Sequence, residues 1–206
     1  MRIAIIGATG KAGRLIAQEA AARGHDVVRF ARSAKDGVDV VKDVFDLDAA
    51  DLHGLDVVVD ALGFFTPDTL PNHTRSLEHL AGLLVGSNTR LVVVGGAGSL
   101  YMDPQKTTQL FETPTFPDEF KPLAEAQAQQ LAALREHHDV KWTYVSPAAD
   151  FQPDAPRTGR YVLGGELFET DSNGLSELSY ADYAIAFVDE VERAEHVGER
   201  ISVRNP

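Results

Sequence analysis

Three glycines, Gly7, Gly10 and Gly13, are spaced three residues apart in the segment GATGKAG, directly after the apolar run Ile3–Ile6. Glycine has no Cβ, so it permits positive φ and a close approach of the main chain to another group. When a strand precedes such a turn and a helix follows it, the turn is typical of pyrophosphate binding. We expect Gly7 to form the exit from the strand, Gly10 to approach the phosphate, and Gly13 to let the helix pack on the sheet.

The residues between these glycines complete the predicted phosphate site. Lys11 and Ala12 open the expected helix, whose free amides and positive dipole end favour an anion. Thr9 adds a hydroxyl donor. The alternative is a glycine-rich turn that binds nothing.

The end of the second predicted strand indicates which dinucleotide is bound. An acidic residue there usually meets a free ribose 2′-hydroxyl, whereas an arginine meets a 2′-phosphate. Arg32 lies nineteen residues after Gly13, and Ser33 and Lys35 follow it. A guanidinium can hold a phosphate with two hydrogen bonds, so the sequence favours NADP(H), with NAD(H) as the alternative. The competing interpretation of Arg32 is a solvated arginine beyond a strand.

Other segments at predicted strand ends fit the same cofactor. Phe45 and Asp46 are expected near the adenine, unless they form a plain surface turn. Small residues that permit close approach to the ribose, pyrophosphate and nicotinamide are Ala61, Leu62, Gly63, Gly95, Gly96 and Ala97. For Ala61, Leu62 and Gly63, the alternative role is simple packing at the strand end.

The hydroxyl groups nearest to the expected nicotinamide belong to Ser99 and Tyr101, which we take as the candidate catalytic residues. None of the five tyrosines has a lysine four residues later, so the usual Tyr-x-x-x-Lys acid–base pair is absent. The histidines are scattered, and the chain has no cysteine, so we predict no metal site.

These residues are positioned by an alternation of strand-like and helical segments. The alternation predicts an α/β fold, namely a Rossmann-like doubly wound parallel sheet with helices on both faces, in a single domain of residues 1–206. Short strands are also expected around Tyr161–Leu163 and Leu167–Glu169. The main strands are predicted at Ile3–Ile6, Asp26–Ala31, Val38–Val44, Val57–Leu62, Leu91–Val94, Trp142–Val145 and Arg200–Val203, and the helices at Lys11–Arg23, Asn72–Val85, Leu123–His137 and Ser179–Arg193.

The amino-acid composition limits the kinds of partner that the chain can bind. The chain has 206 residues and a net charge of −12, which argues against nucleic acid and anionic membranes. The apolar runs are of strand length, so no membrane span is predicted. The lack of cysteine fits a reducing compartment, and we expect a cytoplasmic protein.

Four segments resemble one family over essentially the whole chain: GATGKAG, GGAGSLYMDP, WTYVSPAADFQPDAPRTGRY and SELSYADYAIAFVDEVE. They are similar to the NADH-flavin reductase group of atypical short-chain dehydrogenases/reductases, whose relatives include NmrA-like proteins and biliverdin reductase B. The resemblance implies NAD(P)(H) binding, with Pro147 at the cofactor and residues 148–178 as a small C-terminal lobe covering the substrate. Ala97 and Ala148 depart from the biliverdin reductase pattern, which carries serine and histidine there.

The resemblance implies an NAD(P)H-dependent oxidoreductase that passes a hydride to a flavin (FMN or FAD) or a quinone-like acceptor. In the lobe, Phe151 is a candidate to stack on a flat substrate, and Arg157 a candidate to bind its phosphate or carboxylate. Their alternatives are a small lobe core and an ion pair with Asp150 or Asp154. The rival functions are an NmrA-like regulator that senses NADP(H) without turnover and an epimerase or dehydratase. The expected partner is a small molecule, and the chain is expected to be a monomer or homodimer.

Overall fold

All neighbouring strands of the central eight-stranded sheet are parallel except the edge strand β8, which is antiparallel to β10. The computed structural model describes residues 1–206, and the strand order in the sheet is β3-β2-β1-β4-β5-β6-β10-β8. The chain therefore has the predicted doubly wound topology, with its order reversing between β1 and β4. The strands of this sheet are Arg2–Ile6 (β1), Asp26–Ala31 (β2), Val40–Val41 (β3), Val57–Asp60 (β4), Arg90–Val94 (β5), Trp142–Ser146 (β6), Val162–Gly164 (β8) and Glu199–Arg204 (β10).

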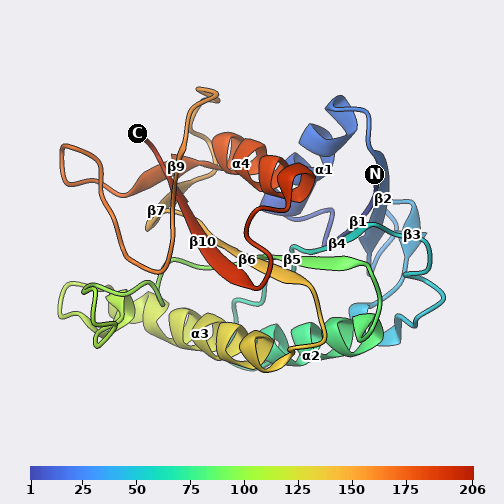
Figure 1. The fold of residues 1–206 in the computed structure, drawn as a ribbon, viewed down its shortest axis with the longest axis horizontal. Helices are drawn as coiled ribbons and strands as arrows, with labels where there is room; N and C mark the ends of the chain where they lie inside the picture. Colours follow the sequence, from blue (N-terminus) through green and yellow to red (C-terminus); the bar gives the residue numbers. More distant parts are fainter.

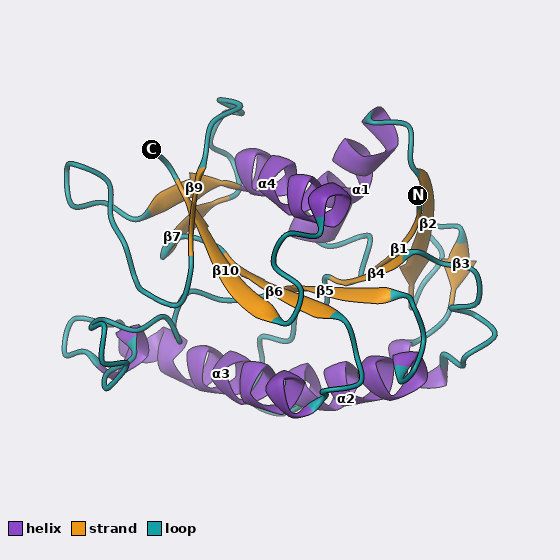
Figure 2. Ribbon diagram, viewed as in Figure 1, coloured by secondary structure: helices purple, strands orange, loops and turns teal.

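Helices cover both faces of the sheet, so its central strands are buried and apolar on both sides. Helices α1 (Lys11–Ala22) and α4 (Tyr180–Arg193) lie together on one face, and α2 (Asn72–Leu84) and α3 (Lys121–Glu136) on the other (Figures 1 and 2). Three short 3-10 helices, at Val44–Asp46, Leu110–Glu112 and Asp118–Phe120, lie in the connections.

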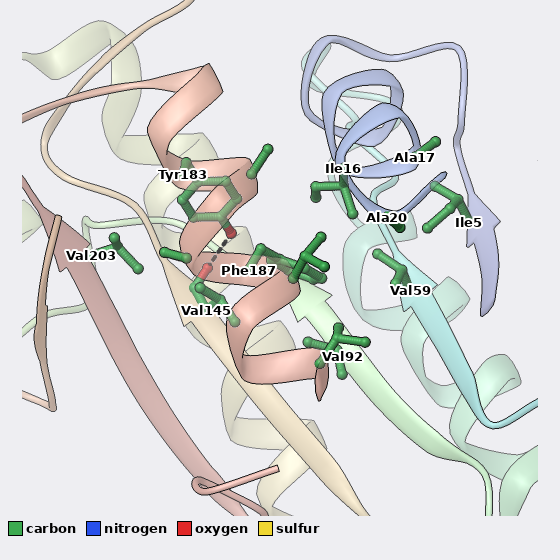
Figure 3. Close-up of a cluster of buried hydrophobic side chains, with 14 of the residues drawn as sticks. Ile5, Ile16, Ala17, Ala20, Val59, Val92, Val145, Tyr183, Phe187 and Val203 are labelled. Atoms are coloured by element: carbon green, nitrogen blue, oxygen red, sulfur yellow. Dashed lines mark hydrogen bonds between the residues drawn. The ribbon is translucent and has the colours of Figure 1, made fainter. Parts of the chain in front are cut away.

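The core on the α1 and α4 side is centred on two aromatic residues of α4, Tyr183 and Phe187 (Figure 3). Both are fully buried among aliphatic side chains of β1, β4, β5 and α1. Tyr183 keeps its hydroxyl satisfied by donating to the carbonyl of Val145, at 2.7 Å. This bond fixes α4 over the end of β6.

The structure corrects two of the predicted strands. The third strand contains only Val40 and Val41, because the Asp43 carboxylate accepts from the amide of Phe45 and turns the chain into a 3-10 helix. No strand forms at Leu167–Glu169, where Leu167 makes a single bridge to Tyr101.

The segment after β6 is divided between two sheets. Strand β8 extends the central sheet, whereas β7 (Asp150–Gln152) and β9 (Glu177–Ser179) form a separate parallel pair. None of the helices has the length and apolar character that crossing a bilayer requires.

Candidate functional site

The turn between β1 and α1 is shaped by contacts that only glycine permits. Gly7 has φ of +86°, and a Cβ on it would lie 2.7 Å from the carbonyl oxygen of Ala61. A Cβ on Gly13 would overlap the carbonyl oxygen of Gly7, and one on Gly10 would lie 3.3 Å from that same oxygen. The tight exit and the close helix packing predicted for Gly7 and Gly13 are therefore present.

The first amides of α1 have no acceptor within the chain. Gly10 is the N-cap residue and provides no side-chain cap, and the first turn contains no acidic residue. The amides of Lys11, Ala12 and Gly13 donate to no other group of the protein. Exposed Thr9 lies just before them. Unpaired amides and the positive end of the helix dipole fit an anion such as a pyrophosphate.

Unpaired cations gather around this turn in an otherwise acidic chain. Lys11 and Arg14 in the first turn of α1 are exposed and make no ion pair or hydrogen bond to the protein. Arg32, directly after β2, is likewise exposed and unpaired, as is Lys35. By contrast, Arg29 within β2 pairs with Asp39 at 3.5 Å. The charge at this edge of the sheet fits a ligand with several phosphate groups.

The residues predicted near the adenine lie at the surface after β3. Phe45 is 39% exposed, and the guanidinium of Arg75 lies 5.3 Å from the centre of its ring. Asp46 and Ser33 are also exposed, and no other side chain of the protein bonds theirs. A half-exposed aromatic ring at this edge offers a flat apolar surface to a base.

At the end of β4, a buried carboxyl holds the turn that contacts Gly7. Asp60 is 2% exposed, and its Oδ1 accepts from the amide of Leu62 at 3.1 Å, while Oδ2 has no partner. Burial raises the pKa of Asp60 to about 7. Sequence reasoning missed this residue, although an acid that interrupts a buried apolar strand was a visible signal. Gly63, further along the turn, leaves room for the ring of Phe65, which is 75% exposed.

The glycines after β5 are explained by packing within the protein. A Cβ on Gly95 would overlap the Tyr144 ring, and a Cβ on Gly96 would overlap the side chain of Gln127 in α3. Ala97, half-buried between them and Gly98, has the smallest side chain available. Because these residues are small, the loop after β5 packs closely against α3, and the next residues, Ser99 and Leu100, are buried.

The two candidate hydroxyl residues differ in access. Ser99 is only 2% exposed, and its Oγ accepts from the guanidinium of Arg200 at 2.9 Å. Tyr101 is half-buried, and its hydroxyl has no partner within the protein. Tyr101 is therefore the candidate that can donate to a ligand, whereas Ser99 belongs to a buried cluster with Arg200 and Glu166. Sequence reasoning missed both of these charged residues.

The lobe is attached to the helices by its polar residues. Arg157 pairs with Glu19 of α1 at 2.5 Å, not with either aspartate expected from the sequence, and its side chain stays 56% exposed. Asp182 in the first turn of α4 accepts from the amides of Thr158 and Gly159, at 2.9 and 2.8 Å. The RTG segment (residues 157–159) is therefore bonded to the SYAD segment (residues 179–182), and these bonds attach the lobe to the start of α4.

Aromatic stacking occurs where the lobe meets the end of β6. Phe151 stacks on Tyr180, with ring centres 3.6 Å apart and planes 6° apart. One face of the Phe151 ring is thus covered by Tyr180, which agrees with the alternative that Phe151 belongs to a small core of the lobe. Pro147 is buried at the turn that leads into this pair.

Comparison with known proteins agrees with this geometry. Residues 7–191 match the profile of a protein family described as NAD(P)H-binding. The chain belongs to this NAD(P)H-binding family. The match starts at Gly7, includes the glycine turn, and ends at residue 191 within α4.

Relatives of known structure share the whole fold. A Streptococcus pneumoniae protein described as "a putative NADH-flavin reductase" is 51% identical, with a TM-score of 0.97 and 100% of both chains covered. A Bacteroides thetaiotaomicron protein described as a "putative epimerase" is 30% identical, with a TM-score of 0.86, covering 99% of this chain and 96% of that one. A relative by sequence, the "Uncharacterized protein YwnB" of Bacillus subtilis, is 44% identical over 98% of both chains. The predicted resemblance to an NAD(P)H-binding family that includes proteins described as NADH-flavin reductases is confirmed.

Proposed function

We propose that this protein is an NADPH-preferring oxidoreductase that reduces a flavin or a quinone-like small molecule. The observation that carries the proposal is the set of free amides at the start of α1 next to the unpaired cations Lys11, Arg14 and Arg32. Amides bind a pyrophosphate of either dinucleotide, whereas the guanidinium after β2 adds a partner that only a 2′-phosphate needs.

In the proposed cofactor site, each part of the dinucleotide lies at the end of a different strand. The turn at Gly7–Gly13 would hold the pyrophosphate, Arg32 with Ser33 the 2′-phosphate, and Phe45 with Asp46 the adenine side. Ala61, Leu62 and Gly63 would line the ribose. The loop after β5 and Pro147 would border the nicotinamide, which supplies two electrons and one proton as a hydride.

Tyr101 is proposed to act on the acceptor. A flavin or quinone that receives a hydride becomes an anion, and it takes its second proton from water. A hydroxyl that donates a hydrogen bond to this anion stabilises the charge as it develops. The Tyr101 hydroxyl is free to do so because it has no partner in the protein. The description of the Streptococcus relative supports a flavin as acceptor.

The second candidate function is an NADP(H) sensor without turnover. It is favoured by the absence of a Tyr-x-x-x-Lys pair and by the burial of Ser99. An epimerase or dehydratase has less support, because that chemistry normally uses the same missing acid–base pair.

One experiment separates these functions. NADPH absorbance is followed with the purified protein, alone and with FMN, FAD or a small quinone, and NADPH binding is measured by calorimetry. The oxidoreductase predicts a steady, protein-dependent loss of NADPH that saturates with one of these acceptors. Saturable binding without turnover would establish the sensor instead, and no binding of either dinucleotide would refute both.

A further inference from the structure

Arg200, in β10, is an arginine whose side chain is completely buried. Its exposed fraction is 0%, and its backbone pairs with Tyr144 of β6. Ile201 and Val203 of the same strand belong to the core on the α1 and α4 side. A guanidinium at such a position is costly unless its charge is paired and its donors are used.

The guanidinium joins two segments that are far apart in the sequence. One nitrogen donates to Ser99 Oγ at 2.9 Å, and another donates to Glu166 Oε2 at 2.6 Å and to the Glu166 carbonyl at 3.2 Å. The ring of Tyr101 lies 5.8 Å from the guanidinium carbon. Arg200 therefore contacts the loop after β5 and the segment that follows β8 at once.

Backbone hydrogen bonds run along the same junction. The amide of Tyr101 donates to the carbonyl of Glu166 at 2.9 Å, and the amide of Phe168 donates to the carbonyl of Tyr101 at 2.8 Å. The main chain of Tyr101 is thus bonded to the segment 166–168, and Arg200 orients this segment through Glu166.

The cluster carries an excess positive charge. Glu166 also accepts from Arg135 of α3 at 2.6 Å, so one carboxylate faces two guanidinium groups. Burial opposes ionisation of Glu166, but the charges of Arg200 and Arg135 outweigh it and hold the pKa of that carboxyl below its ordinary value. Because Glu166 stays ionised, it keeps its bonds to both guanidinium groups and holds in place the segment that bonds the main chain of Tyr101.

We propose that Arg200 is a positioning residue, which fixes Tyr101 through Ser99 and Glu166 so that its hydroxyl meets the acceptor as negative charge develops. The proposal rests on the proposed function for the reaction that it assists. It assigns to Arg200 an effect on turnover and none on dinucleotide binding, since Arg200 lies on the other side of β6 from the turn at Gly7–Gly13 in the strand order.

The test compares Arg200→Met and Arg200→Lys with Tyr101→Phe and with a matched control. Arg204→Met is that control, because Arg204 is another arginine of β10 that pairs with an acid, Glu169 at 3.5 Å, without touching Ser99 or Tyr101. We expect kcat to fall about tenfold in Arg200→Met and the Kd of NADPH to stay within about twofold. Arg200→Lys keeps the charge but loses the fork of donors, and should recover only part of kcat.

Two further readouts decide the proposal. In the double variant Arg200→Met with Tyr101→Phe, kcat should equal that of Tyr101→Phe alone, whereas multiplied losses would refute action through Tyr101. Hydrogen–deuterium exchange of the Tyr101 and Phe168 amides should rise in Arg200→Met but not in Arg204→Met. Unchanged exchange of these amides in Arg200→Met would overturn the positioning role, whether or not the wild-type protein turns over. Absence of turnover in the wild-type protein would by itself refute only the proposed function.

Discussion

Arg157 of the lobe and Glu19 of α1 form an ion pair 2.5 Å long, and Arg23 donates to the same carboxylate at 2.8 Å. The bond to Arg157, opposed by burial and helped by Arg23, lowers the pKa of Glu19 below its ordinary value of 4.5. A lowered folded-state pKa stabilises the protein above the unfolded value, and this stability is lost as the pH falls through the folded value. The pair thus attaches the lobe to the helix that follows the glycine turn.

Glu19→Gln is expected to lower the free energy of unfolding by about 2 kcal/mol at pH 7, because its charge-assisted hydrogen bonds to Arg157 and Arg23 are weakened. The difference from wild type should shrink as the pH approaches 4. Urea denaturation at both pH values measures it, with the exposed Glu78→Gln of α2 as the control. An equal loss at both pH values would show that charge is not the cause.

The fold was predictable because its strands are buried on both faces. Runs such as Val57–Val59 in β4 are continuous and apolar, and their alternation with helical segments leaves few topologies. The third strand was overestimated because the Asp43 carboxylate accepts from the amide of Phe45, two residues later, and apolar content does not reveal such a local turn.

The site was predictable only where function acts through the main chain. The roles of Gly7 and Gly13 could be predicted from the sequence because the main chain there excludes a Cβ, whichever side chains lie nearby. The partners of Arg157 and Ser99 were not, since Glu19 and Arg200 lie more than a hundred residues away in the sequence. Such pairs depend on how α1, β10 and the lobe meet in space.

Arg32→Glu tests the preference for NADPH. The carboxylate would repel a 2′-phosphate and would accept from a free 2′-hydroxyl, so we expect the Kd of NADPH to rise at least tenfold and that of NADH to change by no more than about threefold. Calorimetry or nucleotide fluorescence measures both values.

The matched control for this substitution is Lys141→Glu, which makes the same charge change directly before the amino end of β6, whereas Arg32 follows the carboxyl end of β2. It should leave both dissociation constants near the wild-type values. Equal weakening of NADPH and NADH by Arg32→Glu would contradict the assignment of Arg32.

Asp60→Asn tests the buried carboxyl. Burial raises its pKa from 3.8 to about 7, so the folded protein binds a proton that the unfolded chain releases. This group therefore reduces stability as the pH rises from about 4 to about 7, and the reduction is complete above that range. Asparagine keeps the acceptor for Leu62 and removes the charge.

At pH 8, Asp60→Asn should unfold with a free energy higher than wild type by up to about 4 kcal/mol, and the gain should fall towards zero near pH 4. Denaturation curves across this range measure the gain. The exposed Asp68→Asn, in the loop after β4, is the control and should show no such dependence. A gain independent of pH would mean that packing, not ionisation, is responsible.

Gly13 and Gly82 are both helical glycines, but only one is constrained by its surroundings. A Cβ on Gly13 would overlap the carbonyl oxygen of Gly7, whereas a Cβ on Gly82 in α2 would meet nothing within 4 Å. Gly82→Ala should therefore stabilise the protein by about 1 kcal/mol, the usual gain in helix propensity. Gly13→Ala should destabilise it by about 1 to 3 kcal/mol, because main chain must move.

The same displacement should weaken dinucleotide binding in Gly13→Ala. The clash shifts the start of α1 relative to Gly7, and the amides of Lys11 and Ala12 move with it. We expect the Kd values of NADPH and NADH to rise together, at least tenfold, because both dinucleotides contain the pyrophosphate. Gly82→Ala should bind both as wild type does. If Gly13→Ala lost stability but bound both dinucleotides normally, the pyrophosphate would have to be held away from this turn.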